Sequence, residues 1–445
     1  MIGVKKILSL FTLIIIIFVL CACSKITFNK EDMLSNSCVS DDNNKGVSMD
    51  LNSNEKSEFA TSSTTRYIQS TIKSSSNVQA TTKPRFNRKT NFVMGGDEYG
   101  FCEECDPQDM AKGARFSIEY GYDIAFVISG ITKTFNSNDF KVSVHENGFA
   151  EITKCLSNKN VIEVPTNING YKIAYIGNEC FVGTNAKKII IPEGVLAIGE
   201  RSFAELTSLK SVLLPQSLIV VGTEAFYNCI SLGTLKFGKN LQVIGEESFA
   251  LCKSLSSIEI PTNVRVIASG AFSTCESLLS VKLNKGLLRL GGGAFSNTSI
   301  REIVVPEGIH VMNPGVFGDC KNLKKAILPE KLGDAYNGFG AGMFGGCTSL
   351  EEVRIPNNVK GILQGTFQDC VSLKSITIPK SVEFMSFGVF AGCKNLKDIY
   401  FESKDCDIFA NNFMFMPGLR IHAPKGGSVE KYIRFNPLIK FVATD

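Results

Sequence analysis

The sequence has little of what most catalytic and cofactor sites are built from. Among its 445 residues there are three histidines, His145, His310 and His422, which are widely separated along the chain. We find no Ser-His-Asp spacing, no phosphate-binding glycine loop and no cluster of metal ligands. The sequence therefore predicts neither an enzyme nor a bound cofactor or metal.

An excess of charge of one sign is also lacking. The chain carries 47 Lys and Arg against 43 Asp and Glu, which gives a formal net charge of +4. Two of the positive charges, Lys5 and Lys6, lie in a segment that we expect to be removed. A chain this close to balance gives no electrostatic reason to bind nucleic acid.

Long apolar runs are absent after residue 20. The one such run, from Ile7 to Leu20, follows Lys5-Lys6 and has the charged start and short apolar middle of a secretory signal. It is shorter than the ~20 residues that a membrane-spanning helix needs. We therefore expect everything downstream of it to lie outside the cytoplasm.

The residues that follow this run, Leu20-Cys21-Ala22-Cys23, resemble the signal of bacterial lipoproteins. The resemblance implies that residues 1–22 are a signal peptide, that Cys23 carries a thioether-linked lipid and that the chain stays at a membrane surface. Cleavage without lipidation and an uncleaved anchor are the alternatives. The expected location is the cell surface, with the chain held to the bacterial membrane by lipid.

Two weakly patterned segments come next. Residues 23–91 are rich in Ser, Thr, Asn and Lys, and we predict a disordered tether because they cannot bury enough apolar surface to fold. Residues 92–139 contain Cys102 and Cys105 in a C-x-x-C that lacks the further Cys or His ligands of a zinc site. We expect a local disulfide or two unpaired thiols there, with metal binding and redox catalysis as weaker alternatives.

Residues 177–417 repeat the frame I-G-x-x-A-F-x-x-C-x-x-L-x-x-I-x-I-P-x-x-V, most clearly from Ile244 to Val264. Its phenylalanines recur every 22 or 23 residues, except for an interval of 27 between Phe317 and Phe344. Self-similarity at this period indicates a solenoid of stacked repeats. Seven of the 15 cysteines occupy one frame position and are predicted to form a ladder of small, buried, free thiols: Cys229, Cys252, Cys275, Cys320, Cys347, Cys370 and Cys393.

The ends of the repeat run differ from it and are expected to cap the stack. In residues 140–176, Asn147-Gly148 separates alternating apolar residues, which predicts a β-hairpin. In residues 418–445, Ser428 is expected to cap a short helix and residues 438–442 to form a last strand.

The repeat frame resembles the BspA-like leucine-rich repeats of bacterial surface antigens, from about Val144 to the C-terminus. The resemblance implies a leucine-rich-repeat parallel β-solenoid with short helical turns. It also implies a secreted or cell-surface protein with a role in adhesion or other macromolecular contact. Leu206, Thr184 and Thr298 depart from the frame by replacing the cysteine.

Alternation in L-x-x-I-x-I-P turns Ile258 and Ile260 inward and their neighbours outward. The outward positions of successive repeats form two columns of mixed polar, charged and scattered apolar residues. From these columns we take the candidate binding face: Ser211, Thr234, Lys236, Ser257, Glu259, Ser280, Lys282, Glu302, Lys325, Glu352, Arg354 and Tyr400. The extra residues of the long interval give a candidate binding loop, Asp334, Tyr336 and Asn337, for which a tolerated insertion is the alternative.

These observations together predict a monomeric, lipid-anchored binding module that recognises an extracellular protein or glycan, as in adhesion. The alternative is a structural or assembly protein of the cell envelope, whose solenoid docks another envelope protein. The sequence does not identify the ligand, because the repeats specify the shape of a surface and not its target.

Overall fold

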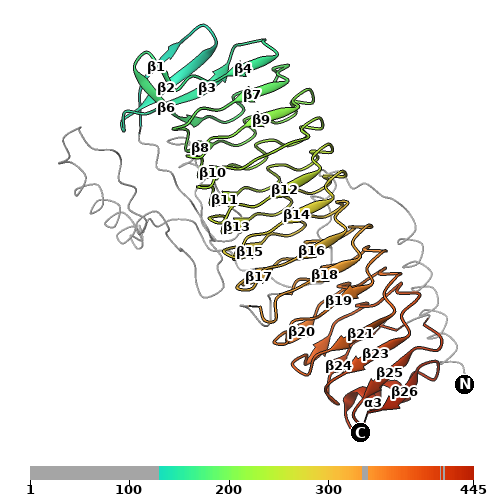
Figure 1. Ribbon diagram of the computed structural model, residues 1–445. Coiled ribbons are helices and arrows are strands. Elements are labelled where there is room, and N and C mark those ends of the chain that lie inside the picture. The colour runs from blue at the N-terminus through green and yellow to red at the C-terminus, as the bar shows by residue number, and fades with distance from the viewer. Residues whose placement is uncertain (1–129, 333–338, 411, 414–415, 445) are drawn as a thin grey trace, which may run out of the picture. The chain divides into compact units, whose positions relative to one another are not determined.

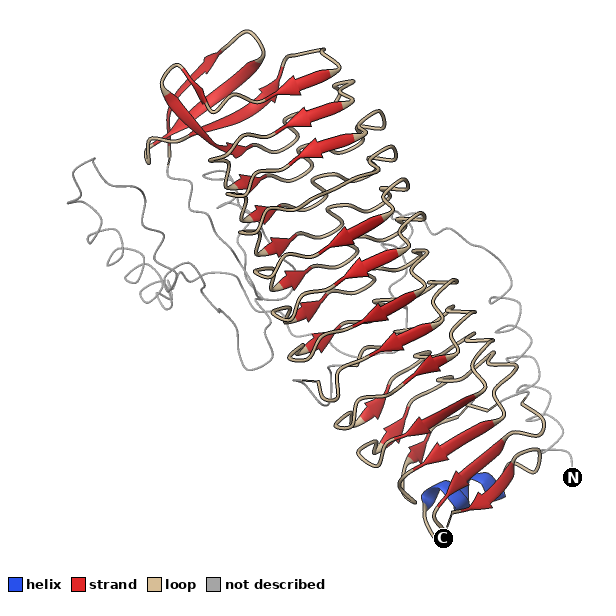
Figure 2. Cartoon of the chain, viewed as in Figure 1, coloured by secondary structure: helices blue, strands red, loops and turns tan. Residues whose placement is uncertain are grey.

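The computed structural model of the protein describes residues 130–332, 339–410, 412–413 and 416–444. These residues form a parallel β-solenoid in which successive repeats stack one on the next (Figure 1). Most coils contribute one strand to each of two faces, and turns join the faces (Figure 2). Two coils contribute only an isolated bridge to one face, Thr234 beside Ser211 and Phe339 beside Met312. The predicted parallel β-solenoid is therefore confirmed.

The L-x-x-I-x-I-P stretches form one face, which we call the first sheet. Its strands pair in parallel with the repeats in register, so that Ser257, Ile258 and Glu259 lie beside Ser280, Val281 and Lys282. Its ladders follow the chain, in the orders β4-β7-β9, β12-β14, β16-β18-β19 and β21-β23-β25-β26. The strands are β4 (Val161–Glu163), β7 (Lys188–Ile190), β9 (Ser211–Leu213), β12 (Ser257–Glu259), β14 (Ser280–Lys282), β16 (Glu302–Val304), β18 (Lys325–Ile327), β19 (Glu352–Val353), β21 (Ser375–Ile378), β23 (Asp398–Phe401), β25 (Arg420–Ala423) and β26 (Lys440–Ala443).

The V-x-x-I-G stretches form the opposite face, the second sheet, which sequence analysis did not predict as strands. Most of these strands are two residues long and pair in parallel, as Val243 and Ile244 do with Val266 and Ile267. They run in the order β6-β8-β10-β11-β13-β15-β17, followed after the long interval by β20-β22-β24. The strands are β6 (Tyr171–Ile176), β8 (Ala197–Ile198), β10 (Val220–Val221), β11 (Val243–Ile244), β13 (Val266–Ile267), β15 (Arg289–Leu290), β17 (Val311–Met312), β20 (Gly361–Ile362), β22 (Phe384–Met385) and β24 (Asp407–Ile408).

Antiparallel strands cover the N-terminal end of the second sheet. The predicted hairpin is present as β2 (Phe140–His145) and β3 (Ala150–Cys155), and β3 continues the sheet by pairing in parallel with β6. A further strand that was not predicted, β1 (Ile131–Asn136), pairs with the outer edge of β2. The short β5 (Asn167–Ile168) pairs with β6.

The core between the two sheets is a column of aromatic rings and thiols. The frame phenylalanines from Phe181 to Phe390 are fully buried. Neighbouring rings stack with centroids 4.6 to 6.0 Å apart. Each ladder cysteine is buried as a free thiol, as predicted.

The A-F-x-x-C turns that follow the glycine of I-G are not the short helical turns that were expected. The A-F-x-x-C stretch makes single turns closed by bonds such as that from the Cys252 amide to the Phe249 carbonyl, 3.2 Å, and no residue of it is α-helical in the described coils. The glycine of I-G is not needed for an unusual backbone conformation, because Gly245 lies outside the left-handed region. A Cβ on Gly245 would instead lie 2.6 Å from the carbonyl carbon of Gly222 in the preceding coil, so this glycine permits close stacking.

The C-terminal cap contains the helix α3 (Ser428–Arg434) and the expected last strand, β26, which pairs in parallel with β25. The predicted capping role of Ser428 is wrong, because Gly427 is the N-cap residue and Ser428 is the first residue of the helix. The Ser428 hydroxyl instead bridges to the backbone of Cys406, which ties the helix to the last coil.

Candidate functional site

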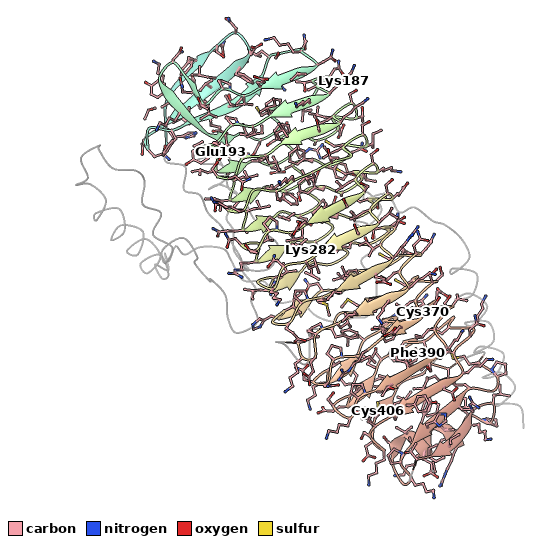
Figure 3. All side chains as sticks on the ribbon, viewed as in Figure 1. Lys187, Glu193, Lys282, Cys370, Phe390 and Cys406 are labelled. Carbon is pink, nitrogen blue, oxygen red and sulfur yellow. The ribbon has the colours of Figure 1, made fainter. Side chains whose placement is uncertain are left out.

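The predicted binding-face residues lie on the outward side of the first sheet. Parallel pairing in register brings them together as two columns, in which Ser257 lies beside Ser280 and Glu259 beside Lys282 on β14. Figure 3 labels Lys282 among the side chains of the repeats. Ser211 and Lys325 are partly buried. The exposed members are Thr234, Lys236, Ser257, Glu259, Ser280, Lys282, Glu302, Glu352, Arg354 and Tyr400.

Several charges on this face pair with each other across neighbouring strands. The Lys282 ammonium lies 2.5 Å from a Glu259 oxygen, and the Lys325 ammonium lies 2.7 Å from a Glu352 oxygen. Because these pairs are largely exposed, they contribute little to stability. They do neutralise the middle of the face, so a strongly charged partner is not favoured there.

Exposed apolar side chains interrupt the polar columns. Leu213, Val304 and Ile327 are 51%, 57% and 46% exposed although they lie on strands. Val304 and Ile327 are direct neighbours on β16 and β18 and form a continuous apolar patch. The outward columns predicted from the sequence contain all three as scattered apolar residues, but the candidate binding face taken from those columns did not include them.

The C-terminal end of the face carries a hydrogen-bonded cluster around Asp398. Its carboxylate accepts hydrogen bonds from Arg420 at 2.7 and 2.6 Å and lies 2.7 Å from Nε2 of His422, whose ring stacks on Tyr400. The hydrogen bonds from Arg420 lower the pKa of Asp398 to about 2. The carboxylate is therefore ionised and its oxygens are already hydrogen-bonded, which suits a structural role better than proton transfer.

The other two histidines belong to different surroundings. His145 is buried in the N-terminal strands, where its Nε2 lies 2.9 Å from a Glu151 oxygen, and burial raises the pKa of Glu151. His310 is exposed in a repeat beside β17. The three histidines thus lie in separate parts of the fold and do not form a common site.

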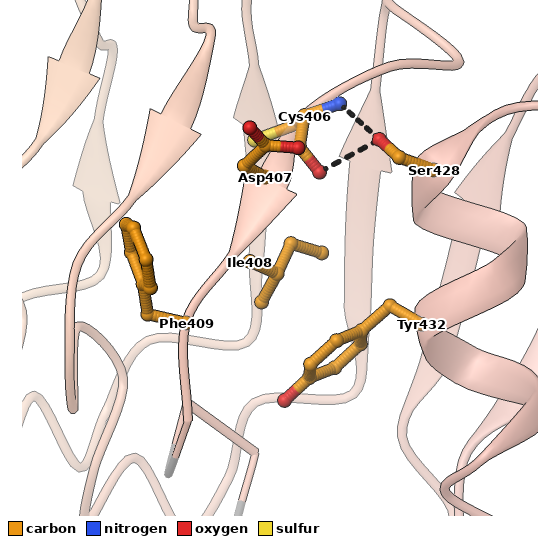
Figure 4. Close-up of a pocket in the computed structure, with 6 residues that line it drawn as sticks. All are labelled: Cys406, Asp407, Ile408, Phe409, Ser428 and Tyr432. Atoms are coloured by element: carbon orange, nitrogen blue, oxygen red, sulfur yellow. Dashed lines mark hydrogen bonds between the residues drawn. The ribbon is translucent and has the colours of Figure 1, made fainter.

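A shallow pocket of about 290 Å³ lies between the last coil and α3, lined by Cys406, Asp407, Ile408, Phe409, Ser428 and Tyr432 (Figure 4). The Ser428 hydroxyl is occupied, because it donates to the Cys406 carbonyl at 3.0 Å and accepts from the Cys406 amide at 2.9 Å. Burial raises the pKa of the Cys406 thiol to about 12, so the thiol stays protonated. Neither group is an activated nucleophile.

Other predicted sites fall outside the described residues. These are Cys23, the Cys102 and Cys105 pair, and the candidate binding loop with Asp334, Tyr336 and Asn337. Within the residues that the structure does describe, there is no group of metal-ligating side chains. No helix in that part of the chain is long and apolar enough to span a membrane.

Comparison with solved structures finds similar proteins at low identity. A leucine rich cell surface protein from Faecalibacterium prausnitzii is 22% identical, with a TM-score of 0.44, over 67% of this chain and 97% of that one. A leucine-rich repeat protein from Bacteroides ovatus is 25% identical, with a TM-score of 0.43, over 70% of this chain and 100% of that one. The pneumococcal vaccine antigen PcpA is 17% identical, with a TM-score of 0.44, over 71% of this chain and 99% of that one.

A search of curated proteins finds no significant match. The family model for the BspA type leucine rich repeat region matches residues 174–282, 242–339 and 334–425, which together cover more than half of the chain. These matches span the coils that carry the phenylalanine and cysteine ladders, and no family of enzymes is indicated. The chain therefore belongs to the BspA type leucine-rich repeat family.

Proposed function

We propose that the protein is a binding module that holds an extracellular macromolecule on the outward face of its first sheet. The observation that carries this proposal is the patch of Val304 and Ile327, two adjacent aliphatic side chains that remain about half exposed on an ordered sheet. Adjacent exposed apolar side chains with a polar rim favour a contact surface more than apolar residues scattered singly do.

The surroundings of the patch have the composition of a protein-binding surface. Apolar anchors near the centre of an interface contribute most of its binding energy, and the polar rim around them excludes water. Here the Lys325–Glu352 pair and the Lys282–Glu259 pair lie on the strands to either side of Val304. Because the patch is aliphatic and offers no aromatic platform for a sugar ring, it favours a protein partner over a glycan.

The finer part of the proposal is that the protein binds at the cell surface, as an adhesin, while anchored by lipid at Cys23. The Leu20-Cys21-Ala22-Cys23 pattern and the membership of the BspA type leucine-rich repeat family support it. Cys23→Ser should release the protein from the membrane fraction into the medium and abolish incorporation of labelled fatty acid. Cys21→Ser is the matched control and should change neither; release by both variants, or by neither, would contradict the anchor.

Binding is tested with the full chain against a panel of purified extracellular matrix proteins and a glycan array. For any member bound, Val304→Asp combined with Ile327→Asp should weaken binding by at least about tenfold, because charges would then be buried at the centre of the contact. Leu279→Asp is the matched control, since Leu279 is 46% exposed but precedes the strand β14. Equal effects of the patch and control variants would rule out the first sheet as the binding face.

A further inference from the structure

The outward side of the second sheet carries apolar residues that are buried as deeply as a core. They form a cluster separate from the solenoid core, which we call the stripe: Ala174, Tyr175, Ala197, Val220, Val243, Val266 and Ala268. Val220, Val243 and Val266 lie in register on adjacent strands, and each is 1% exposed. On the first sheet, by contrast, the outward Val304 is 57% exposed.

The described residues supply a rim for the stripe but no cover. The hydrophobic side chains among them that pack against it are Phe149, Leu196 and Ile219. Leu196 and Ile219 immediately precede Ala197 and Val220 in the chain, so they flank the stripe along the coils and do not close over it. A valine that faces outward from an uncovered sheet stays largely exposed, as Val304 does, so the burial of the stripe requires a further segment.

The geometry points to residues 116–128 of the same chain as the segment that covers the stripe. Every second residue in it is large and apolar: Phe116, Ile118, Tyr120, Tyr122, Ile124, Phe126 and Ile128. In an extended chain this alternation places all seven side chains on one face. The intervening positions are polar or small up to Asp123, as Ser117 and Glu119 are, which suits a solvent-facing side; the last two, Ala125 and Val127, are apolar.

The length of the segment matches the stripe. Thirteen extended residues reach about 40 Å at ~3.3 Å per residue. The stripe crosses five adjacent strands, from β6 to β13, which span about 19 Å at ~4.8 Å per step. The segment can therefore cross the whole stripe and still connect to the described chain.

The described chain begins at Gly130, close to the stripe, as expected if the preceding residues cover it. The carbonyl of Gly130 accepts a hydrogen bond from the Glu146 amide at 2.9 Å, which places Gly130 beside the turn between β2 and β3. That turn carries Phe149, which packs against the stripe. The strand that follows Gly130, β1, is largely exposed, with Ile131 at 59%, so the burial lies over the stripe and not over β1.

The proposal assigns different roles to the two sheets. The second sheet is closed by the protein's own chain, and the first sheet is left as the open face. Docking of residues 116–128 would also connect everything N-terminal to the repeats at a fixed place near the start of the solenoid. This inference does not depend on the proposed binding function, since it concerns the opposite face.

The test is carbene footprinting of the full chain with a small photoactivated diazirine, which labels exposed side chains without prior substitution. In the unaltered protein we expect Val220, Val243 and Val266 to be labelled as little as core residues, and Val304 and Ile327 to be labelled strongly. Ile124→Asp combined with Phe126→Asp should raise labelling of the three stripe valines several-fold. Ala125→Asp combined with Val127→Asp, on the opposite face of the alternation, is the matched control and should leave it low.

Each other outcome would overturn the proposal. Strong labelling of the stripe in the unaltered protein would mean that the stripe is open. Low labelling that persists in the Ile124→Asp and Phe126→Asp variant would assign the cover to another segment. Protection that disappears on dilution would assign it to a second copy of the chain.

Discussion

The thiol of Cys252 donates a hydrogen bond to the backbone carbonyl of Phe226 in the preceding coil, with Sγ 3.3 Å from the oxygen. The same contact recurs at all seven ladder cysteines, over 3.0 to 3.3 Å. Six of these seven carbonyls also accept an amide bond within their own turn, as Phe226 does from Cys229. The carbonyl of Phe295 instead accepts a hydrogen bond from the Thr298 hydroxyl. A thiol suits this position because it is small, tolerates burial and can still donate weakly.

The ladder thiols should resist modification in the folded protein. They are buried, and burial raises the pKa of Cys229, Cys275 and Cys393 to about 12, whereas the thiolate is the reactive form. Cys320 differs, because a hydrogen bond from Cys347 lowers the pKa of its thiol, so its protection rests on burial alone. With a maleimide or iodoacetamide, we expect them to stay unlabelled in native protein from pH 7 to 10 and to label readily in denaturant. Rapid native labelling of most of the seven would show that they are not core residues.

Removing one ring from the phenylalanine column should strongly destabilise the solenoid. The Phe272 ring stacks on Phe249 at 5.3 Å and on Phe295 at 5.5 Å between centroids. Phe272→Ala should lower the free energy of unfolding by about 3 to 5 kcal/mol, because it leaves a cavity between coils. Hydrogen exchange should rise first in the adjoining coils, since repeats are stabilised by their neighbours. Leu279→Ala, at an exposed position, should change the free energy of unfolding by less than ~0.5 kcal/mol. Equal losses of stability in the two variants would show that the stacked phenylalanine rings do not stabilise the solenoid.

The repeat period of the sequence was sufficient to predict the phenylalanine column and the cysteine ladder, because each frame position recurs many times and every copy has the same surroundings. The second sheet could not be predicted in this way, since strands such as Val243–Ile244 are too short to show alternation. The strand β1 is exposed along most of its length and has no apolar face to detect. Ser428 lies outside the repeats, so no second copy of its position indicates its role. Its hydrogen bonds to Cys406 depend on which coil the helix contacts.

The sequence could predict that the side chains of the candidate binding face point outward, but not which of them contact each other. Alternation placed Glu259 and Lys282 outward, and pairing in register then made them partners. The stripe was missed for a physical reason, because an outward valine such as Val243 cannot be distinguished from the inward Ile244 by residue type. The candidate loop residues Asp334, Tyr336 and Asn337 stay a prediction, since they lie outside the described residues.

The close approach of neighbouring coils should make Gly245 intolerant of a side chain. An added Cβ would meet the backbone of Gly222 at 2.6 and 2.8 Å and the Val221 carbonyl oxygen at 2.7 Å. Gly245→Ala should therefore cost about 1 to 3 kcal/mol in unfolding free energy, as overpacking does. Gly233→Ala is the matched control, because its Cβ would find its nearest neighbour at 3.8 Å. Denaturant unfolding of both variants measures the difference, and equal stability would show that the coils can separate at no cost.

Acid should weaken the C-terminal cap through Asp398. The hydrogen bonds from Arg420 lower its pKa to about 2, below the ordinary 3.8, so the unfolded chain takes up a proton at higher pH than the folded chain. The stabilisation is fully present above pH 3.8 and is lost as the pH falls through about 2. Asp398→Asn should therefore lower the melting temperature at pH 5 but differ little from the unaltered protein at pH 2. Glu352→Gln, which breaks an exposed pair with Lys325, should have a small effect throughout. A deficit of Asp398→Asn that stays constant between pH 5 and 2 would show that the cluster does not stabilise the cap through the charge of Asp398.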